Sequence, residues 1–210
     1  MSIGGQRRDY VGAPLLESGA KADPLEQFLD WFRAIETLEE EPNAMTLATV
    51  SADGQPSARM VLLKGVDARG FTFFTNYDSR KGGELAANPR ASLLFYWRSV
   101  ERQVRVEGRV ERVGDAESDA YFMTRPIEAR WSAYASPQSR PVQGRTDLEG
   151  RVEEVRQRFG DRVPRPAWWG GLRVRPHAYE FWQGRPNRVH DRLHYESHDG
   201  GTWRRQRLGP

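Results

Sequence analysis

The sequence predicts a mainly β protein with a few peripheral helices, an α+β domain built on a closed or nearly closed barrel. Many short β-prone segments follow one another, turn signals separate them, and only a few segments show the periodicity of a capped helix. A length of 210 residues favours one domain over two. We expect residues 1–22 to form a flexible polar arm and residues 23–210 to form a single domain.

The first expected helix begins after Asp23, an N-cap residue. Pro24 occupies its first turn, and Glu26 is placed to complete a capping box. Apolar residues at helical spacing give this helix one buried face. They are Leu25, Phe28, Leu29, Phe32 and Ile35.

The middle of the chain is expected to consist mostly of strands. β-prone runs are bounded by Gly, Asp and Asn, which favour turns. The expected strands are 45–50, 59–64, 71–75, 91–97 and 103–113, with turns at 51–54 and 67–70. One short helix over 81–87 is expected to end before Asn88-Pro89, because the residue before a proline is disfavoured in a helix.

The C-terminal half begins with a helix that Asp115 caps and that Pro126 ends after Arg125. Residues 130–146 are expected to form a long loop. A second capping box, Thr146 with Glu149, predicts the start of another helix. After a proline-rich bend at 164–166, the expected strands are 172–182, 188–195 and 203–208.

Composition excludes several classes of protein. No apolar run is long enough to cross a bilayer, residues 1–10 lack the apolar stretch of a secretory signal, and cysteine is absent, so a cytoplasmic protein is expected. The net charge of +3 is too small to favour a nucleic-acid binder. Four histidines without zinc spacing predict no metal site. The sequence also lacks the glycine motifs of Rossmann and P-loop sites.

Basic side chains supply the first candidates for a binding site. Lys21, Lys64 and Lys81 are the only lysines, so arginine supplies nearly all of the positive charge. The planar guanidinium group matches phosphate oxygens, and the excess is therefore compatible with anionic ligands. Genomic base composition is the plainer explanation of the same bias.

Three groups of residues are candidates for binding an anion. On the strand expected at 188–195, alternation places Arg188, His190 and Arg192 on one face, where an anion would relieve their repulsion. Tyr121 and Arg125 are four residues apart on one helix face and could bind a phosphate together. Ordinary solvated side chains are the alternative explanation of both groups.

The third group comprises Arg59 and Lys64 on a strand and Ser79-Arg80-Lys81 at a helix start. Odd spacing directs Arg59 and Lys64 to opposite faces, so that the two would serve different groups, such as two phosphates. The alternative for Lys64 is a lysine at the end of an apolar strand that extends into solvent. A hydroxyl, a guanidinium and an ammonium beside free backbone N–H groups make residues 79–81 a candidate phosphate site.

Taken together, these segments resemble the pyridoxine 5′-phosphate oxidase family. The most specific match is Glu180-Phe181-Trp182-Gln183-Gly184 followed by Arg188-Val189-His190-Asp191-Arg192, which is similar to that family's C-terminal signature. Further matches run from Arg7 to Pro210 in order. They include residues 59–64, 79–81, Glu101-Arg102-Gln103, Tyr121-Phe122, Arg125-Pro126, 136–140 and Trp169-Gly170-Gly171.

The resemblance implies an FMN-binding split β-barrel that works as a homodimer, with the flavin at the subunit interface. By match to the family, the FMN-binding residues would be Arg59, Met60, Val61, Leu62, Leu63, Lys64, Phe74, Thr75, Arg80, Lys81, Gln103, Gln138, Ser139, Trp182 and Arg192. Lys64, Tyr121 and Arg125 would hold the substrate phosphate. Arg188 and His190 would lie at the substrate ring as catalytic residues, and Arg7 and Tyr10 would belong to an arm that closes over the substrate.

The reaction implied by the resemblance is oxidation of pyridoxine or pyridoxamine 5′-phosphate to pyridoxal 5′-phosphate, with O2 as electron acceptor and H2O2 as product. Arg188 would position the substrate and stabilise charge, because a guanidinium stays protonated.

One position departs from the family pattern. Ala129 stands where a serine hydroxyl is expected on the substrate phosphate, and Arg130 or Ser132 could take over that contact. Loss of one neutral hydrogen bond costs about 0.5–1.5 kcal/mol.

Two alternatives therefore remain beside the vitamer oxidase. One is a related flavin oxidase of the phenazine-pathway type, and the other is a non-catalytic binder of flavin or pyridoxal phosphate.

Overall fold

The computed structural model describes residue 5, residues 9–197 and residues 201–210. Within these residues, nine strands form one antiparallel sheet in the order β2-β1-β5-β6-β7-β4-β3, with β8 paired to β7 and β9 paired to β8. The strands are β1 (Ala44–Val50), β2 (Pro56–Leu62), β3 (Gly65–Asp67), β4 (Gly70–Asn76), β5 (Arg90–Trp97), β6 (Arg102–Arg112), β7 (Trp169–Gln183), β8 (Asp191–Glu196) and β9 (Arg204–Arg207).

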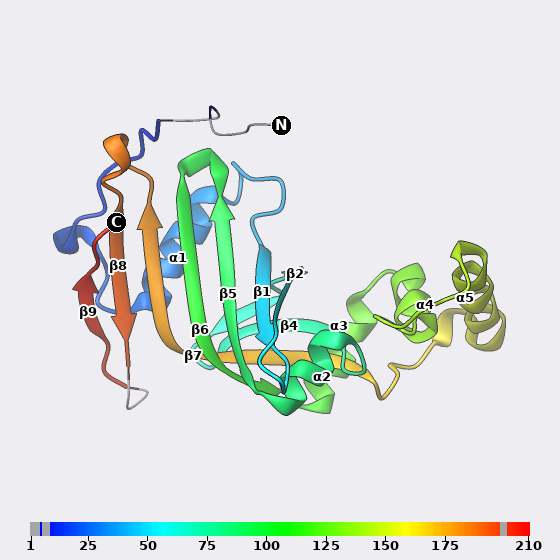
Figure 1. Ribbon diagram of the computed structural model, residues 1–210. Coiled ribbons are helices and arrows are strands. Elements are labelled where there is room, and N and C mark those ends of the chain that lie inside the picture. Colours follow the sequence, from blue (N-terminus) through cyan, green and yellow to red (C-terminus); the bar gives the residue numbers. More distant parts are fainter. Residues whose placement is uncertain (1–4, 6–8, 198–200) are drawn as a thin grey trace.

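Helices lie at the periphery of the sheet, as Figure 1 shows. The helices are α1 (Pro24–Ile35), α2 (Arg80–Ala87), α3 (Asp115–Thr124), α4 (Ile127–Ala135) and α5 (Arg145–Phe159). Short 3-10 turns occur at Glu17–Gly19, Arg98–Val100, Gly160–Arg162 and Pro186–Arg188. The predicted mainly β fold with peripheral helices is confirmed.

Strand β7 organises the sheet, because its two halves pair with different neighbours. Residues 169–174 pair with β4 and residues 178–183 pair with β8, while β6 pairs with β7 from residue 172 to residue 183. The β6–β7 register shifts between Glu107 and Gly108, where a Cβ on Gly108 would lie 2.2 Å from the Arg175 carbonyl oxygen. In Figure 1, β7 runs across the molecule and then turns upward beside β8. The bend divides the sheet into two connected parts.

The main core lies between α1 and the sheet. Asp23 caps α1 by accepting a hydrogen bond from the backbone N–H of Leu25, as the sequence predicted. Phe28 is fully buried and packs edge-on against Phe71, with ring centroids 4.9 Å apart. Trp31 packs edge-on against Phe181. These large rings bury apolar surface that stabilises the domain.

A second, smaller core joins α3, α4 and α5 to the start of β7. Phe122, Val155, Val163 and Trp169 are buried there. Trp131 on α4 donates from Nε1 to the carbonyl oxygen of Gly160, and the Tyr134 and Phe159 rings lie 4.9 Å apart. These contacts fix the helical group to the sheet at the end where β4 pairs with β7.

The structure corrects three sequence expectations about elements. Residues 127–135 form α4 where a loop was expected, because Ala129, Ala133 and Ala135 favour helix once Pro126 has ended α3. Helix α3 has Gly114 at its N-cap, with Asp115 inside the first turn. Helix α5 begins at Arg145 after Gly144, so the expected cap at Thr146 is wrong.

A fourth correction concerns the C-terminal signature. Residues 188–190 were expected on a strand, but Pro186–Arg188 forms a 3-10 turn and β8 begins only at Asp191. Asn187 and Arg188 have positive φ values of 57° and 62°, which no strand tolerates. The alternation argument for Arg188, His190 and Arg192 is therefore wrong.

Among the described residues, no helix has the length and apolar character needed to span a membrane. The same part of the chain contains no cluster of side chains suited to a metal ion.

Candidate active site

A cavity of about 300 Å3 lies where β2, β4, α2 and α3 meet, at the lower end of volumes typical of small-molecule sites. Its lining comes from six separate segments of the chain. The lining residues are Met60, Val61, Leu62, Lys64, Phe74, Thr75, Lys81, Tyr121, Arg125, Gln138 and Trp169. All of them except Trp169 are among the site residues expected from the sequence. The fold thus brings these separated residues together.

The cavity is positively charged. Lys64, Lys81 and Arg125 line it, and no carboxylate does. Burial and the nearby charge of Arg59 lower the pKa of Lys81 to about 8. Burial also lowers the pKa of Arg125, whose NH1 is buried without a hydrogen-bond partner among the described residues. Buried cations of this kind are stabilised by a bound anion, so the cavity fits phosphate groups.

Aromatic rings form one wall of the cavity. The Phe74 and Tyr121 rings stack with centroids 3.9 Å apart, and the Trp169 ring lies parallel to Tyr121 at 6.2 Å. The Arg125 guanidinium lies 4.8 Å from the Trp169 centroid, so a cation–π contact orients it. Trp169 was missed as a site residue, although its motif was noted in the sequence.

Residues 79–81, which were expected to hold a phosphate, lie at the start of α2. Ser79 caps the helix by accepting from the Gly82 N–H. Lys81 Nζ donates to Thr75 Oγ1 at 3.0 Å and to Gln138 Oε1 at 2.7 Å. The ammonium group therefore lies between β4 and the segment that carries Gln138, directed into the cavity rather than into solvent.

Arg59 and Arg80 meet at a buried carboxylate that the sequence analysis missed. Glu84 accepts from Arg80 Nε at 2.8 Å and from Arg59 NH2 at 3.1 Å, and also from the hydroxyls of Thr49 and Ser57. Burial opposes ionisation of Glu84, but these hydrogen bonds outweigh it and lower its pKa to about 2. The i, i+4 spacing of Arg80 and Glu84 is the one signal the sequence offered.

A second group of expected site residues lies on β6, β7 and β8. Gln103 is opposite Trp182, which is opposite Arg192. The His190 ring lies 4.8 Å from Trp182, and His190 Nδ1 accepts from the backbone N–H of Arg185 at 3.1 Å. This hydrogen bond leaves Nε2 to carry the proton of the neutral imidazole.

The two arginines of the signature differ in their surroundings. Arg192 forms a bidentate pair with Glu180, with Nε and NH2 each 3.0 Å from a carboxylate oxygen, and these hydrogen bonds raise its pKa. Arg188 is exposed, and within the described chain no hydrogen bond or ion pair engages its side chain. Arg188 is therefore free to contact a ligand, whereas Arg192 is already neutralised.

The two groups of site residues are not brought together within one chain. Phe74 is opposite Gly171 near the start of β7, whereas Trp182 lies near its end. From Gly171 to Trp182 the strand covers a contour of roughly 35 Å at 3.3 Å per residue. Arg188 and His190 therefore lie far along the sheet from Lys64 and Tyr121.

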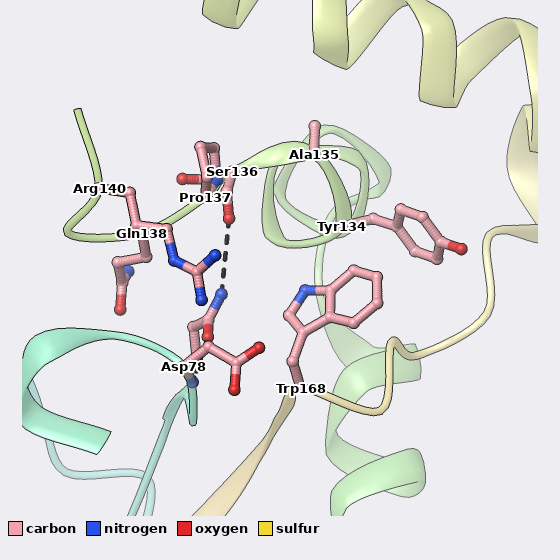
Figure 2. A pocket seen from close by; sticks show the side chains of 9 residues that line it. Asp78, Tyr134, Ala135, Ser136, Pro137, Gln138, Arg140 and Trp168 are labelled. Carbon is pink, nitrogen blue, oxygen red and sulfur yellow. Dashed lines mark hydrogen bonds between the residues drawn. The ribbon is translucent and has the colours of Figure 1, made fainter. Parts of the chain in front are cut away.

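A neighbouring cavity shares Gln138 with the first one (Figure 2). Asn76 Nδ2 donates to the carbonyl oxygen of Ser136 across it, and the Asp78 and Arg140 side chains point into it. It is also lined by Tyr134, Ala135, Pro137 and Trp168. Because both signs of charge are present, this cavity is less suited to an anion than the first.

The remaining expected residues are placed as follows. Leu63 is 6% exposed and does not line the first cavity. Ser139 is exposed with a φ of 68° and also lies outside the lining. Arg7 lies outside the described residues. Tyr10 packs edge-on against both Trp182 and His190.

The segment that departs from the family pattern lies on α4. Ala129, Arg130 and Ser132 do not line the first cavity. The Ser132 hydroxyl donates to the backbone oxygen of Glu128, one turn earlier in the same helix. Neither Arg130 nor Ser132 therefore replaces the missing hydroxyl in this arrangement.

The chain matches two protein-family descriptions. Residues 32–159 match "Pyridoxamine 5′-phosphate oxidase", and residues 169–210 match "Pyridoxine 5′-phosphate oxidase C-terminal dimerisation region". A protein from Cupriavidus necator named pyridoxine/pyridoxamine 5′-phosphate oxidase is 62% identical over 97% of both chains. A protein of the same name from Bordetella petrii is 57% identical over the full length of both.

Solved structures resemble the fold closely. PhzG from Burkholderia lata, in complex with tetrahydrophenazine-1-carboxylic acid, has a TM-score of 0.88 and 32% identity over 95% of this chain and 99% of its own. An FMN-binding protein from Nostoc punctiforme related to pyridoxamine 5′-phosphate oxidase has a TM-score of 0.71 and 18% identity, over 90% and 98% of the two chains. The fold is the FMN-binding split barrel.

Proposed function

The chain belongs to the pyridoxamine 5′-phosphate oxidase family, and on this premise we propose that it oxidises pyridoxine 5′-phosphate or pyridoxamine 5′-phosphate to pyridoxal 5′-phosphate, with FMN as cofactor and dioxygen as electron acceptor. Curated relatives at 55–62% identity over nearly the whole chain carry this function in their names. One structural observation carries the proposal. Lys64, Lys81 and Arg125 line one cavity without a carboxylate, as a pair of phosphorylated ligands requires.

The residues divide between the two phosphates. We assign Lys81, with Arg59 and Arg80 behind it on Glu84, to the FMN phosphate. Lys64, Tyr121 and Arg125 would bind the substrate phosphate on the aromatic side of the cavity, where Arg125 NH1 has no protein partner among the described residues. Charge-assisted hydrogen bonds of this type contribute about 1.5–3 kcal/mol each.

The protein's part in the reaction is to bind and orient. When bound, FMN supplies a two-electron acceptor for the hydrogen at the C4′ carbon of the substrate and passes the electrons to O2, which becomes H2O2. The alcohol substrate gives the aldehyde directly, and the amine requires one water and releases ammonia. Arg188 would position the substrate ring while remaining protonated, and His190, held through Nδ1 by Arg185, would present Nε2–H to it.

A homodimer would bring the two separated groups of site residues together at the subunit interface. The match of residues 169–210 to a dimerisation region supports pairing of two copies. We propose that Lys64, Lys81, Tyr121 and Arg125 of one copy face Gln103, Trp182, Arg188 and His190 of the other. The modest volume of the first cavity agrees with this arrangement, because a flavin and a vitamer together need more room than one chain provides.

The direct test is cofactor content and turnover. Purified protein is expected to be yellow, to release FMN on denaturation, and to produce pyridoxal phosphate and H2O2 in equal amounts from pyridoxine 5′-phosphate in air. Colourless protein that cannot take up FMN would refute the flavin assignment. Yellow protein without turnover would favour a non-catalytic binder.

A second candidate function rests on the likeness to PhzG. That relative is 32% identical with a TM-score of 0.88, and this chain lacks a hydroxyl at Ala129. The alternative is oxidation of a tricyclic carboxylic acid. Turnover of a reduced phenazine carboxylic acid at higher kcat/KM than either vitamer phosphate would favour it.

A further inference from the structure

At Val11 and Gly12, the arm before α1 is hydrogen-bonded to one carboxylate near the C-terminal end of β7. Glu101 Oε2 accepts hydrogen bonds from the backbone N–H groups of Val11 at 2.7 Å and Gly12 at 3.0 Å. Glu101 is only 3% exposed, whereas the Val11 side chain is 81% exposed. Apolar burial therefore does not anchor this stretch of the arm, and the hydrogen bonds to Glu101 do.

Glu101 is itself rigidly placed. Its carbonyl oxygen accepts from the Gly184 N–H at 2.8 Å and from Gln183 Nε2 at 3.2 Å, which ties it to the end of β7. Its backbone lies in the left-handed region at φ 56°, after the 3-10 turn Arg98–Val100. Glycine is the residue that such a backbone favours. A glutamate is uncommon in this conformation, and here its side chain accepts two backbone hydrogen bonds from the arm.

The backbone of the arm approaches β7 closely at Gly12. A Cβ at Gly12 would lie 2.7 Å from the Gly184 carbonyl oxygen, so only glycine allows this approach. Arg185 NH1 donates to the Gly12 carbonyl oxygen from the other side. Further along the arm, the Leu15 N–H donates to Asp191 Oδ2 at 3.0 Å. The arm is thus held by hydrogen bonds along its backbone, and beyond Gly12 also by the buried Leu15 side chain and the Glu17–Arg207 ion pair.

Anchoring of Val11 and Gly12 determines where Tyr10 lies in the candidate active site. Tyr10, directly before the anchored residues, places its ring 5.4 Å from His190 and 5.5 Å from Trp182. The ring also lies on the backbone of Gly184, where a Cβ would come within 2.8 Å of it. The position of Tyr10 over His190 therefore follows from the anchoring of Val11 and Gly12.

We propose that Glu101 is a positioning residue for the oxidase reaction: it fixes the arm so that Tyr10 closes the His190 side of the site over the substrate. Its partners are backbone N–H groups of the arm, and it does not line the cavity that holds Lys64 and Arg125. The inference rests on the proposed function for the identity of the substrate, but not for the anchoring of the arm.

The experiment compares Glu101→Ala and Glu101→Gln with Glu39→Gln as a matched control. Glu39 Oε1 accepts from the Ser99 N–H and hydroxyl in the same 3-10 turn, but none of its described contacts is to the arm. Hydrogen exchange at the Val11 and Gly12 amides is measured in the FMN-loaded protein, together with KM, kcat and FMN affinity.

In Glu101→Ala we expect exchange at these amides to accelerate and KM for pyridoxine 5′-phosphate to rise, each at least about tenfold, because two charge-assisted hydrogen bonds are lost. FMN affinity should stay within about twofold by the same reasoning, since the phosphate site is untouched. Glu101→Gln keeps one acceptor oxygen, so its exchange rate and KM should lie between those of wild type and Glu101→Ala. Glu39→Gln should change neither the exchange rate nor KM.

A double-mutant cycle separates positioning from general stability. With Tyr10→Ala already present, Glu101→Ala should raise KM little further, because both act through the same ring. Fully additive effects, unchanged amide exchange, or faster exchange with unchanged KM would each overturn the proposal. If neither vitamer is turned over at all, the proposed function fails, while amide exchange still decides whether Glu101 anchors the arm.

Discussion

Single residues show how far sequence reasoning reaches into the site. Lys64, Lys81, Tyr121 and Arg125 were expected from the family resemblance, and the cavity contains all four. Local periodicity could not predict that these four residues line one cavity, because this depends on how β2, α2 and α3 pack together. Glu84 and Glu101 were not assigned roles, although Glu101 belongs to a matched motif, because their roles depend on the donors that the fold brings to them.

The lowered pKa of Lys81 predicts a pH dependence for cofactor binding. In the free protein Lys81 loses its proton near pH 8, whereas a bound phosphate stabilises the ammonium and raises that pKa. FMN affinity is therefore expected to fall as the pH rises above 8, by up to about tenfold per pH unit until the higher pKa is reached. Below pH 8, Lys81 should not make FMN affinity depend on pH.

Fluorescence titration of the apoprotein with FMN between pH 7 and 9.5 measures this slope. The Lys81→Arg variant keeps its charge throughout the range and should bind FMN without the same fall. An equal slope in both proteins would show that another group titrates.

At the scale of elements, strands and capped helices were predictable wherever the signal was local. The cap at Asp23 and the helix start at Ser79 are both confirmed, because capping depends on residues two or three positions away. Helix α4 was missed, since Pro126 was taken as the end of helical structure rather than as a new N-cap. The turn before β8 was missed because positive φ values at Asn187 and Arg188 leave no mark in hydrophobic periodicity.

Glu84 joins three elements, because it accepts from Thr49 on β1, Ser57 and Arg59 on β2, and Arg80 on α2. Its folded-state pKa of about 2 lies below the ordinary value of 4.5. The stabilisation is therefore complete above pH 4.5 and is lost as the pH falls toward 2. It should amount to on the order of 2–3 kcal/mol.

Urea unfolding of wild type and Glu84→Gln at pH 7 and pH 3 tests this expectation. The variant should be less stable at pH 7, and the difference between the two proteins should shrink at pH 3. Glu149→Gln, which removes an exposed ion pair within α5, is the control and should have little effect at either pH. A constant difference at both pH values would contradict the ionic role of Glu84.

For the whole molecule, the proposed site shared between two copies predicts rescue of activity between defective copies. Lys64→Ala and Arg188→Ala homodimers should each have little activity, because every site lacks one of the two groups. A mixed dimer contains one intact site if Lys64 and Arg188 of different copies meet. Random exchange of equal amounts should therefore restore about a quarter of wild-type activity.

Activity assays after unfolding and refolding the two variants together measure this rescue. Refolding each variant alone is the control. If Lys64 and Arg188 served the same site within one chain, every mixed dimer would lack an intact site and no rescue would occur.

The bent strand β7 limits where the chain can be divided. The family's catalytic and dimerisation segments meet between residues 159 and 169, yet β7 beyond this junction pairs with β4, β6 and β8. A chain cut there would lack β7, which lies between β6 and β4 in the sheet. Both strands would then become unpaired edges that are prone to aggregation. The two segments therefore contribute to one sheet, and a truncated gene that separates them should yield insoluble protein instead of a monomeric oxidase.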